Sequence, residues 1–334
     1  CGYYLPFVVT TDNYAIYLLI GSIYFLLLNK ITWSRALLLG VLAGLLNLAR
    51  ADGLLWLALT LISVNILSYQ KKEDECRGTT FPWRENVGAL GGYLLAYGSW
   101  LGRNLVVYGS LTAPGSSHVL WMTEYNQLFS LTPSMYTFQS WLAQGWKEIL
   151  LDRLQAVWIN LGTGVMAQGF IFLFPFILVG GWKLRSHFPV RLAFLGWLVL
   201  LLGESFLFPY ASVRGGFFHA GAVFQPAWLA LTPVGIEKVI ELLPKGRFTR
   251  MSKTILPLII IFTAFILSVM LVKIRVVESG WNEGEYRYLM AEEIIRTHGG
   301  QEEDIVVTVN PPAYNAMTGR RAIVIPDGGM EVLL

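Results

Sequence analysis

The sequence has little charge and almost no cysteine. Asp, Glu, Lys and Arg make up 14% of its 334 residues, against about 25% in a typical soluble domain. Its two cysteines, Cys1 and Cys76, provide neither a disulfide framework nor metal-ligand spacing. A glycine-rich phosphate loop and the nucleophile motif of hydrolases are missing as well. The basic run at 319–321 is too short for a basic patch, so we expect no nucleic-acid partner.

Long apolar runs dominate the chain instead. Hydrophobic residues make up 54% of it, and its mean hydropathy is +0.53. A helix that crosses a bilayer needs about 20 mostly apolar residues, and several runs come close to this length. The sequence therefore predicts an α-helical polytopic membrane protein with about eight spans. The predicted spans are 13–28, 36–49, 53–68, 86–107, 156–182, 192–209, 220–236 and 254–272.

Basic residues are distributed unequally between alternate loops, and Lys and Arg gather on the cytoplasmic side of membrane proteins. One set of loops holds Lys30, Arg35, Lys71, Lys72, Arg77, Arg84, Lys183, Arg185, Arg191, Lys238, Lys245, Arg247, Arg250 and Lys253. The other set, before the tail, holds Arg50, Arg103, Lys147, Arg153 and Arg214. The first set is predicted to be cytoplasmic. We expect a multi-pass protein of the bacterial cytoplasmic membrane with its C-terminal part outside.

Two regions are predicted. Residues 1–273 form a helical membrane domain with an aromatic-rich outer loop at about 108–155, within which 142–154 is expected to lie on the membrane surface. The tail from Arg275 on has five arginines, no lysine and ten acidic residues. It combines an amphipathic helix at 285–296, strands at 305–309 and 322–325, and a Pro-rich turn between them. Residues 274–334 therefore resemble the start of a small extracytoplasmic α/β domain.

The two ends of the chain are unusual for a whole membrane protein. It begins with Cys1 on the predicted outer side, and it ends at Leu334 as a new apolar segment starts. We therefore expect an internal fragment that lacks at least one earlier span and the outer loop after it. The alternative is that Cys1 is the lipidated first residue of a processed lipoprotein.

A charged corner separates the second and third predicted spans. Arg50 and Asp52 interrupt about thirty apolar residues, and charged side chains at membrane depth persist only where they face a cavity, a partner or the interface. They pair with each other to fix the corner, or they line a cavity. Gly40 and Gly44 form a small-residue face that favours close helix packing.

Polar residues gather on the predicted outer face and indicate a polar cavity there. For each of them the alternative is an interfacial or snorkelling side chain. A divalent metal held by two distant histidines and a glutamate is possible in principle, but their spacing is not that of a metal site. The residues are Asp12, Arg50, Asp52, Arg103, His118, Glu124, Tyr125, Arg214 and His219, with His118, His219 and Glu124 as the metal candidates.

Five motifs carry a resemblance to a known family. They are GVLAGLLNLARADGLLW at 40–56, TTDN at 10–13, RGGFFHAGAVFQP at 214–226, and the tail motifs NPPAY at 310–314 and TGRRA at 318–322. The chain resembles the GT-C glycosyltransferases, polytopic enzymes that use polyprenyl-phosphate sugars. These include the protein O-mannosyltransferases, the lipid A aminoarabinose transferases and the rhizobial lipopolysaccharide galacturonosyltransferases.

The resemblance implies sugar transfer from a polyprenyl-phosphate donor to a lipid, glycan or protein acceptor, with no nucleotide site. It places the main catalytic aspartate in the first outer loop, upstream of residue 1. Arg214 and His219 then lie beside the donor phosphate, because a guanidinium grips phosphate through two hydrogen bonds. Asp12 has a supporting role or caps the helix that follows it. The remaining candidates for the cavity or the substrate are Arg50, Asp52, Arg103, Glu124 and Tyr125.

Two other classes of function remain open. A transporter or flippase of lipid-linked sugars also needs a polar cavity, but such proteins commonly show internal repeats and polar residues at the membrane midplane, and neither is evident here. A polytopic scaffold with an outer binding domain needs no cavity. The charged corner speaks against the scaffold.

The loop charges generate a topology prediction. We expect positions 124 and 310 outside and positions 71 and 247 inside, because the basic loops are held in the cytoplasm. Single-cysteine variants in intact cells, treated with a membrane-impermeant thiol reagent, measure this. Modification of a cysteine at position 71 would reverse the assignment.

Overall fold

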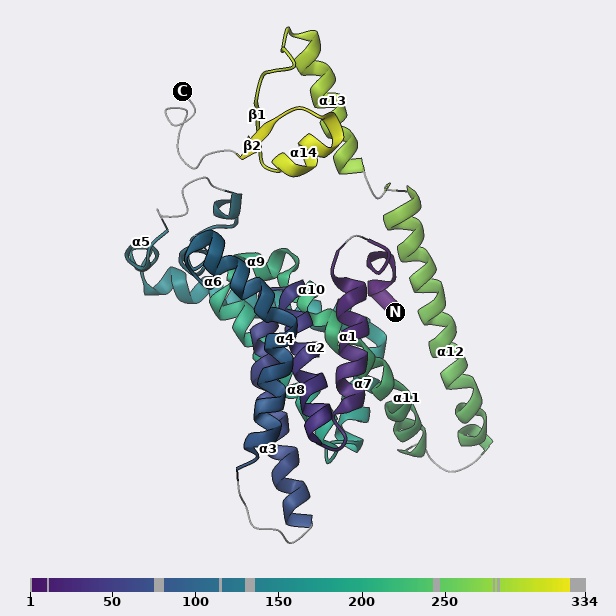
Figure 1. Ribbon diagram of the computed structural model, residues 1–334. Coiled ribbons are helices and arrows are strands. Elements are labelled where there is room, and N and C mark those ends of the chain that lie inside the picture. The colour runs from purple at the N-terminus through teal and green to yellow at the C-terminus, as the bar shows by residue number, and fades with distance from the viewer. Residues whose placement is uncertain are drawn as a thin grey trace. The chain divides into compact units, whose positions relative to one another are not determined.

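A computed structural model describes residues 2–10, 12–74, 81–113, 116–129, 136–242, 247–278, 280 and 283–324. The chain is predominantly helical (Figure 1). It divides into two compact units. The first comprises Cys1–Pro114 and Arg153–Ser268, and the second comprises Gly115–Asp152 and Val269–Leu334.

Long helices form the first unit, and α6 and α12 continue from it into the second. They are α1 (Tyr14–Leu27), α2 (Trp33–Ala49), α3 (Gly53–Asp74), α4 (Trp83–Tyr108), α6 (Trp146–Thr163), α7 (Phe174–Lys183), α8 (Phe188–Leu207), α11 (Gln225–Leu242) and α12 (Arg247–Val272). Short helical turns connect some of them. These are η1 (Gly2–Phe7), η5 (Gly164–Gln168), η6 (Ile171–Leu173), α9 (Pro209–Ala211), η7 (Ser212–Gly216), α10 (Phe217–Gly221) and η8 (Ala222–Phe224).

Several of these helices are long and apolar enough to cross a membrane, as the sequence predicts. Within the described residues, three meet this requirement by length and composition: Gly53–Gln70, Phe188–Leu207 and Lys253–Glu278. The bent pair of α6 and α7 makes a fourth if it counts as one span. Helices α1 and α2 are apolar but shorter. The helical membrane class is thus supported, while the number of eight spans stays a prediction.

The predicted span 156–182 contains a sharp bend. Helix α6 begins ten residues earlier, at Trp146, and an 87° bend separates the segments Trp146–Gln168 and Ile171–Lys183. Phe170 and Ile171 have left-handed backbone angles, with φ of 48° and 44°, and such angles end a right-handed helix. The predicted surface helix 142–154 likewise becomes the start of α6, which continues to Thr163.

The predicted span 220–236 also has different limits. Helix α11 runs from Gln225 to Leu242, so it begins five residues later than predicted. The residues from Pro209 to Phe224 form a succession of short helical turns before it. Gly215 lies in this region with φ of 123°, a backbone angle that glycine adopts without a steric penalty. The chain can therefore reverse its path here and place side chains against several helices.

Glycines permit close contact between neighbouring helices. A Cβ atom at Gly40 of α2 would lie 1.9 Å from the carbonyl oxygen of Ala89 in α4, and one at Gly92 would lie 2.0 Å from that of Leu37. The small-residue packing predicted for Gly40 is confirmed, and Gly44 faces α4 in the same way. Close backbone approach of this kind replaces the hydrophobic driving force that helices lack in lipid.

The second unit contains short elements and an α/β segment. The short elements are η2 (His118–Trp121), η3 (Tyr125–Phe129), α5 (Phe138–Leu142) and η9 (Lys273–Glu278). The α/β segment contains α13 (Glu283–Thr297), β1 (Val306–Thr308), α14 (Pro311–Thr318) and β2 (Ala322–Val324). The two strands are parallel and pair Val306 with Ala322. The predicted helix and both strands are confirmed, apart from residue 325, which lies outside the described residues.

The predicted Pro-rich turn is wrong, because residues from Pro311 form helix α14. Proline is tolerated at the first helical position, and the Asn310 side chain caps the helix by accepting from the Ala313 amide at 3.3 Å. The helix joins two parallel strands, which require a crossover connection. The tail is therefore a strand–helix–strand unit preceded by α13.

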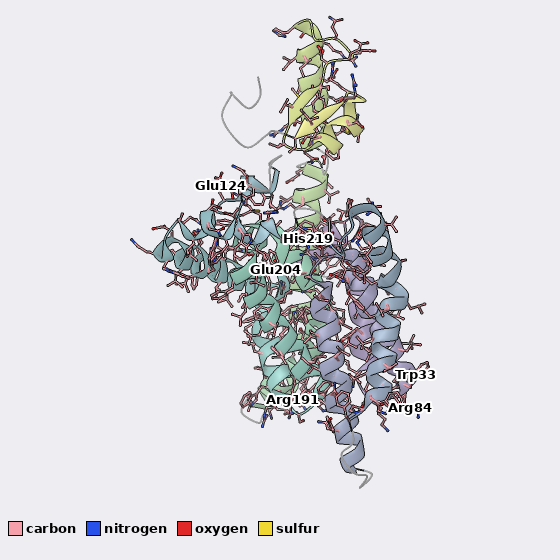
Figure 2. The ribbon with its side chains drawn as sticks, turned by 60° about the vertical axis from the view of Figure 1, so that its left-hand side comes forward. Trp33, Arg84, Glu124, Arg191, Glu204 and His219 are labelled. Atoms are coloured by element: carbon pink, nitrogen blue, oxygen red, sulfur yellow. The ribbon has the colours of Figure 1, made fainter. Side chains whose placement is uncertain are left out.

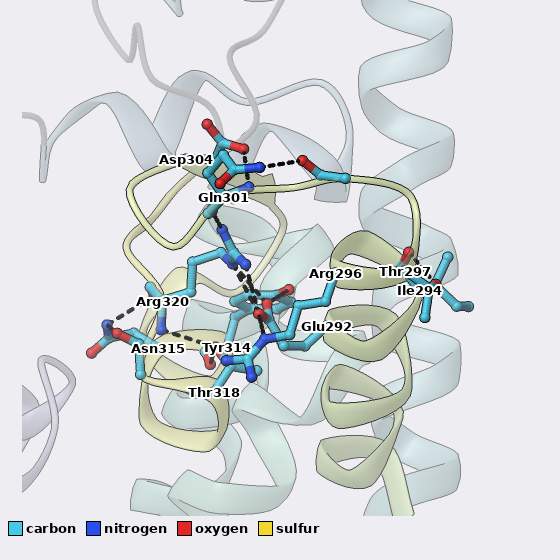
Figure 3. Close-up of polar contacts among 12 residues, drawn as sticks. Glu292, Ile294, Arg296, Thr297, Gln301, Asp304, Tyr314, Asn315, Thr318 and Arg320 are labelled. Carbon is cyan, nitrogen blue, oxygen red and sulfur yellow. Dashed lines mark hydrogen bonds and ion pairs between the residues drawn. The ribbon is translucent and has the colours of Figure 1, made fainter.

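A buried ion cluster holds this α/β segment together (Figure 3). Arg320 donates to both carboxylate oxygens of Glu292, at 2.8 and 2.7 Å. Arg296 and the Tyr314 hydroxyl donate to the same carboxylate at 2.7 and 2.9 Å. These hydrogen bonds, above all those from Arg320, lower the pKa of Glu292 to about 2. The carboxylate is thus ionised at neutral pH and links α13 to α14.

The glycine contacts generate a stability prediction with a control on the next residue. Gly92→Ala forces α2 and α4 apart and should lower the free energy of unfolding by about 1–3 kcal/mol. Gly91→Ala introduces a Cβ with nothing within 4 Å and should be neutral or stabilise by up to about 1 kcal/mol through helix propensity. Thermal unfolding in detergent measures both. Equal behaviour of the two variants would contradict the close packing.

Candidate functional site

The predicted charged corner forms an ion pair. Arg50 ends helix α2 and Asp52 precedes α3, so the two side chains lie on one turn. The Nε atom of Arg50 donates to Oδ1 of Asp52 at 2.9 Å. The predicted pairing is therefore confirmed, and it fixes the connection between two antiparallel helices.

Two further groups reach Arg50 from distant parts of the sequence. Its Nη2 atom donates to Oε1 of Glu204 in α8 at 3.5 Å and to the carbonyl oxygen of Gly216 at 3.2 Å. A Cβ atom at Gly216 would lie 3.1 Å from the other oxygen of Glu204. Glu204 is not among the site residues predicted from the sequence. A signal for it exists, because it is the only acidic residue within the apolar run 192–209.

Asp52 is partnered on one oxygen only. The Tyr17 hydroxyl of α1 lies 3.1 Å from Oδ1 of Asp52 and 3.2 Å from the Leu46 carbonyl oxygen, so its single proton serves one of these acceptors at a time. Oδ2 of Asp52 is buried and has no hydrogen-bond partner among the described residues. A buried carboxylate oxygen without a donor costs free energy, so Asp52 retains capacity to accept another hydrogen bond.

Asp12 and His219 meet at the same end of the unit. Oδ2 of Asp12 lies 3.3 Å from Nδ1 of His219, and Oδ1 of Asn13 lies at the same distance. The imidazole stacks on the Tyr14 ring, with 4.3 Å between the centroids. Asp12 does not cap α1, because Asn13 occupies the cap position. His219 follows Gly216 by three residues and thus joins the surroundings of Arg50.

We call Asp12, Arg50, Asp52, Glu204 and His219 the polar cluster. Its members differ in exposure: the side chains of Glu204 and Asp52 are 9% and 12% exposed, whereas those of His219 and Asp12 are 25% and 44% exposed. Figure 2 shows Glu204 and His219 near one end of the first unit and Trp33, Arg84 and Arg191 near the other. Within the cluster, the side chains of Asp12 and His219 are therefore accessible to solvent, and that of Glu204 is buried.

A second hydrogen-bond network holds the turns that carry His219. The buried Nδ2 of Asn160 in α6 donates to the hydroxyl oxygens of Ser205 in α8 and Ser212 in η7, each at 2.9 Å. The Ser212 hydroxyl also donates to the Pro209 carbonyl at 3.0 Å. These bonds fix the segment that follows α8 against α6, and so they fix the backbone on which Arg214 and His219 lie.

The other predicted site residues are not all brought to the cluster. Arg214 lies exposed in η7, two residues before Gly216. Arg103 lies near the end of α4, where its guanidinium makes cation–π contacts at 4.8 Å from the Trp100 ring and 5.5 Å from the Tyr108 ring. His118, Glu124 and Tyr125 belong to the second unit. His118 uses Nδ1 for the Tyr136 carbonyl, at 2.8 Å.

Neither a metal-binding geometry nor similarity to a known protein narrows the chemistry of the site. Within the described ranges, no group of three or more His, Cys, Asp or Glu side chains is arranged to hold a metal ion. Comparisons with protein-family models, curated proteins and solved structures find no match to this chain. What the cluster can do chemically follows from its groups: carboxylates and an imidazole accept protons, and a guanidinium stabilises negative charge.

The Arg50 contacts generate a stability prediction. Arg50→Met removes the cation from two largely buried carboxylates and should cost about 3 kcal/mol, the lower end for breaking a buried ion pair, because part of the side chain is exposed. Arg35→Met is the control, since Arg35 is half-buried and its guanidinium donates to a backbone carbonyl, that of Lys30 at 3.0 Å, in place of a carboxylate. Thermal unfolding in detergent compares them. A loss no larger than that of Arg35→Met would show that Arg50 does not support the fold.

Proposed function

We propose that this protein is an integral-membrane glycosyltransferase of the GT-C type. It moves a sugar from a polyprenyl-phosphate donor to an acceptor on the outer side of a bacterial cytoplasmic membrane. The observation that carries the proposal is the polar cluster. Three carboxylates, a guanidinium and an imidazole meet at one end of a bundle of apolar helices, and two of the five groups remain accessible.

The chemistry of sugar transfer requires groups of these kinds. The acceptor oxygen attacks the anomeric carbon and gives up its proton, while the bond from that carbon to the phosphate oxygen breaks. A proton acceptor and a cation that stabilises the departing phosphate both lower the barrier. Arg214 is the candidate for the cation that stabilises the departing phosphate. It is exposed, and it lies in the turn whose Gly216 carbonyl accepts from Arg50. His219 lies on the next short helix, α10, and the resemblance assigns it to the same donor phosphate.

A flippase of lipid-linked sugars and a non-catalytic scaffold are the competing interpretations. Neither of them breaks a covalent bond in the donor. Release of free polyprenyl phosphate is therefore the measurement that separates the enzyme from both. A flippase moves the intact donor between leaflets, and a scaffold leaves the donor unchanged.

The proposal predicts the behaviour of Arg214 variants. Arg214→Ala should reduce transfer by about 100- to 1,000-fold, the usual effect of removing one charge-stabilising group, and should leave the thermal stability unchanged because the side chain is exposed. Arg214→Lys should recover part of the activity, since an ammonium keeps the charge and loses the two-pronged geometry. The measurement is turnover of a purified polyprenyl-phosphate sugar in detergent.

Arg185→Ala is the matched control. Arg185 is an exposed arginine after α7 that contacts the Trp182 ring and carbonyl oxygen, so its loss should leave transfer intact. An interfacial role for Arg214 makes a different prediction, because Lys would then replace it fully and Ala would lower membrane insertion and yield. Near-normal turnover of Arg214→Ala would remove Arg214 from the site.

A further inference from the structure

The contact between Asp12 and His219 defines which nitrogen of the imidazole carries a proton. Both atoms at 3.3 Å from Nδ1, a carboxylate oxygen of Asp12 and Oδ1 of Asn13, are acceptors. Nδ1 therefore carries the hydrogen and donates it. In a neutral imidazole the other nitrogen, Nε2, then has a lone pair and accepts protons.

Among the described residues none hydrogen-bonds to Nε2, and the His219 side chain is 25% exposed. Gly215 lies on the Cδ2 and Nε2 side of the ring, where an added Cβ atom would be 3.4 Å from Cδ2 and 3.6 Å from Nε2. Glycine at this position keeps that space empty, and its φ of 123° is one that other residues rarely adopt. Stacking on Tyr14 holds the ring plane. The ring is thus oriented by three neighbours and open on the side of Nε2.

The two buried carboxylates are poorly placed for the same task. Oδ1 of Asp52 accepts from Arg50 and lies within reach of the Tyr17 hydroxyl, while one oxygen of Glu204 faces Arg50 and the other lies beside Gly216. Their side chains are about 10% exposed, so an acceptor hydroxyl reaches them with difficulty. His219 is the least enclosed proton acceptor that is also held in a fixed orientation.

We propose that His219 is a catalytic base of the transfer reaction and that Asp12 is the residue that positions it. This inference rests on the proposed function. Nε2 takes the proton from the acceptor hydroxyl as the acceptor oxygen bonds to the anomeric carbon, and the carbon–oxygen bond to the donor phosphate breaks with its electron pair going to the phosphate. The products are the glycosylated acceptor, the polyprenyl phosphate and a protonated His219, whose charge Asp12 stabilises.

This role differs from the two expectations derived from the resemblance. A base upstream of residue 1 makes His219 dispensable for proton transfer. A donor-phosphate contact by His219 makes its loss visible mainly in the KM for the donor. If His219 is the base, its removal instead lowers kcat and hardly changes the KM for the donor. In that case alone, a small external base can replace the missing imidazole.

The experiment uses the full-length protein in detergent. The probes are farnesyl-phosphate-linked hexoses and pentoses with a cell-envelope lipid extract as acceptor, and mass spectrometry measures the release of farnesyl phosphate. His219→Ala should lower kcat by about 100- to 10,000-fold. Added imidazole should restore part of this loss, whereas pyrazole, a ring of the same size and a far weaker base, should not.

Two further variants complete the design. His219→Gln keeps a polar side chain without a basic nitrogen, so it should be as inactive as His219→Ala while its thermal stability stays close to that of the natural protein. Asp12→Asn should lower turnover in the natural protein and add little to His219→Ala, because the two residues act as one unit. His298→Ala is the control, since His298 is an exposed residue whose Nδ1 lies 2.8 Å from the Ile294 carbonyl.

The outcomes separate the two proposals. Transfer by the natural protein with near-normal turnover of His219→Gln would overturn the role of His219 and leave the glycosyltransferase in place. A folded, inactive His219→Ala that imidazole does not restore would equally exclude the base. A natural protein that releases no farnesyl phosphate from any donor would overturn the proposed function and this inference together.

Discussion

The guanidinium of Arg50 connects three segments that the chain brings together from far apart. Its Nε pairs with Asp52 on the same turn, and its Nη2 reaches Glu204 and the Gly216 carbonyl, which lie 154 and 166 positions further along. In a low-dielectric interior, a cation that contacts two carboxylates offsets part of the cost of removing them from water. Arg50 therefore links the end of α2 to α8 and to the turn after it.

Close helix packing complements this interaction. Glycines at the contacts of α2 with α4 and of α7 with α11 let backbones approach each other directly, and the turns from Pro209 to Phe224 then pass over the end of the packed helices. Asn160 fixes the start of these turns through Ser205 and Ser212, while Arg50 fixes their middle. Gln168 and the Tyr4 hydroxyl donate to the carbonyl oxygens of Phe217 and Phe218, at 3.0 and 2.6 Å. A segment without long regular structure is thus held at several points, and such support is what keeps the side chains of a site in place.

The polar cluster is graded from a buried part to an accessible part. Arg50, Asp52 and Glu204 satisfy much of one another's charge and have a structural role that explains their burial. Asp12 and His219 contact each other at the more exposed side. The division matters for function, because groups that support the fold cannot also change protonation freely. On the accessible side, the proposed chemistry assigns the change of protonation to His219 and a positioning role to Asp12.

The sequence by itself determined the features that depend on near neighbours. These are the apolar helices, the pairing of Arg50 with Asp52, the helix at 285–296 and the two short strands, because hydrophobic runs, residue propensity and a separation of two residues are local properties. It did not show that Pro311 starts a helix, since a Pro-Pro pair fits a turn equally well without knowledge of the crossover that two parallel strands need.

Only the tertiary structure decided which distant groups meet. In the sequence Glu204 is a single acidic residue in an apolar run, and only the packing of α8 brings it to Arg50. His219 lies 206 positions from Asn13, whose side chain it contacts. The bend of 87° between α6 and α7 likewise replaces a run that reads as one continuous span. The physical reason is that these contacts depend on how helix faces pack against each other, and the local pattern of the sequence carries no record of that packing.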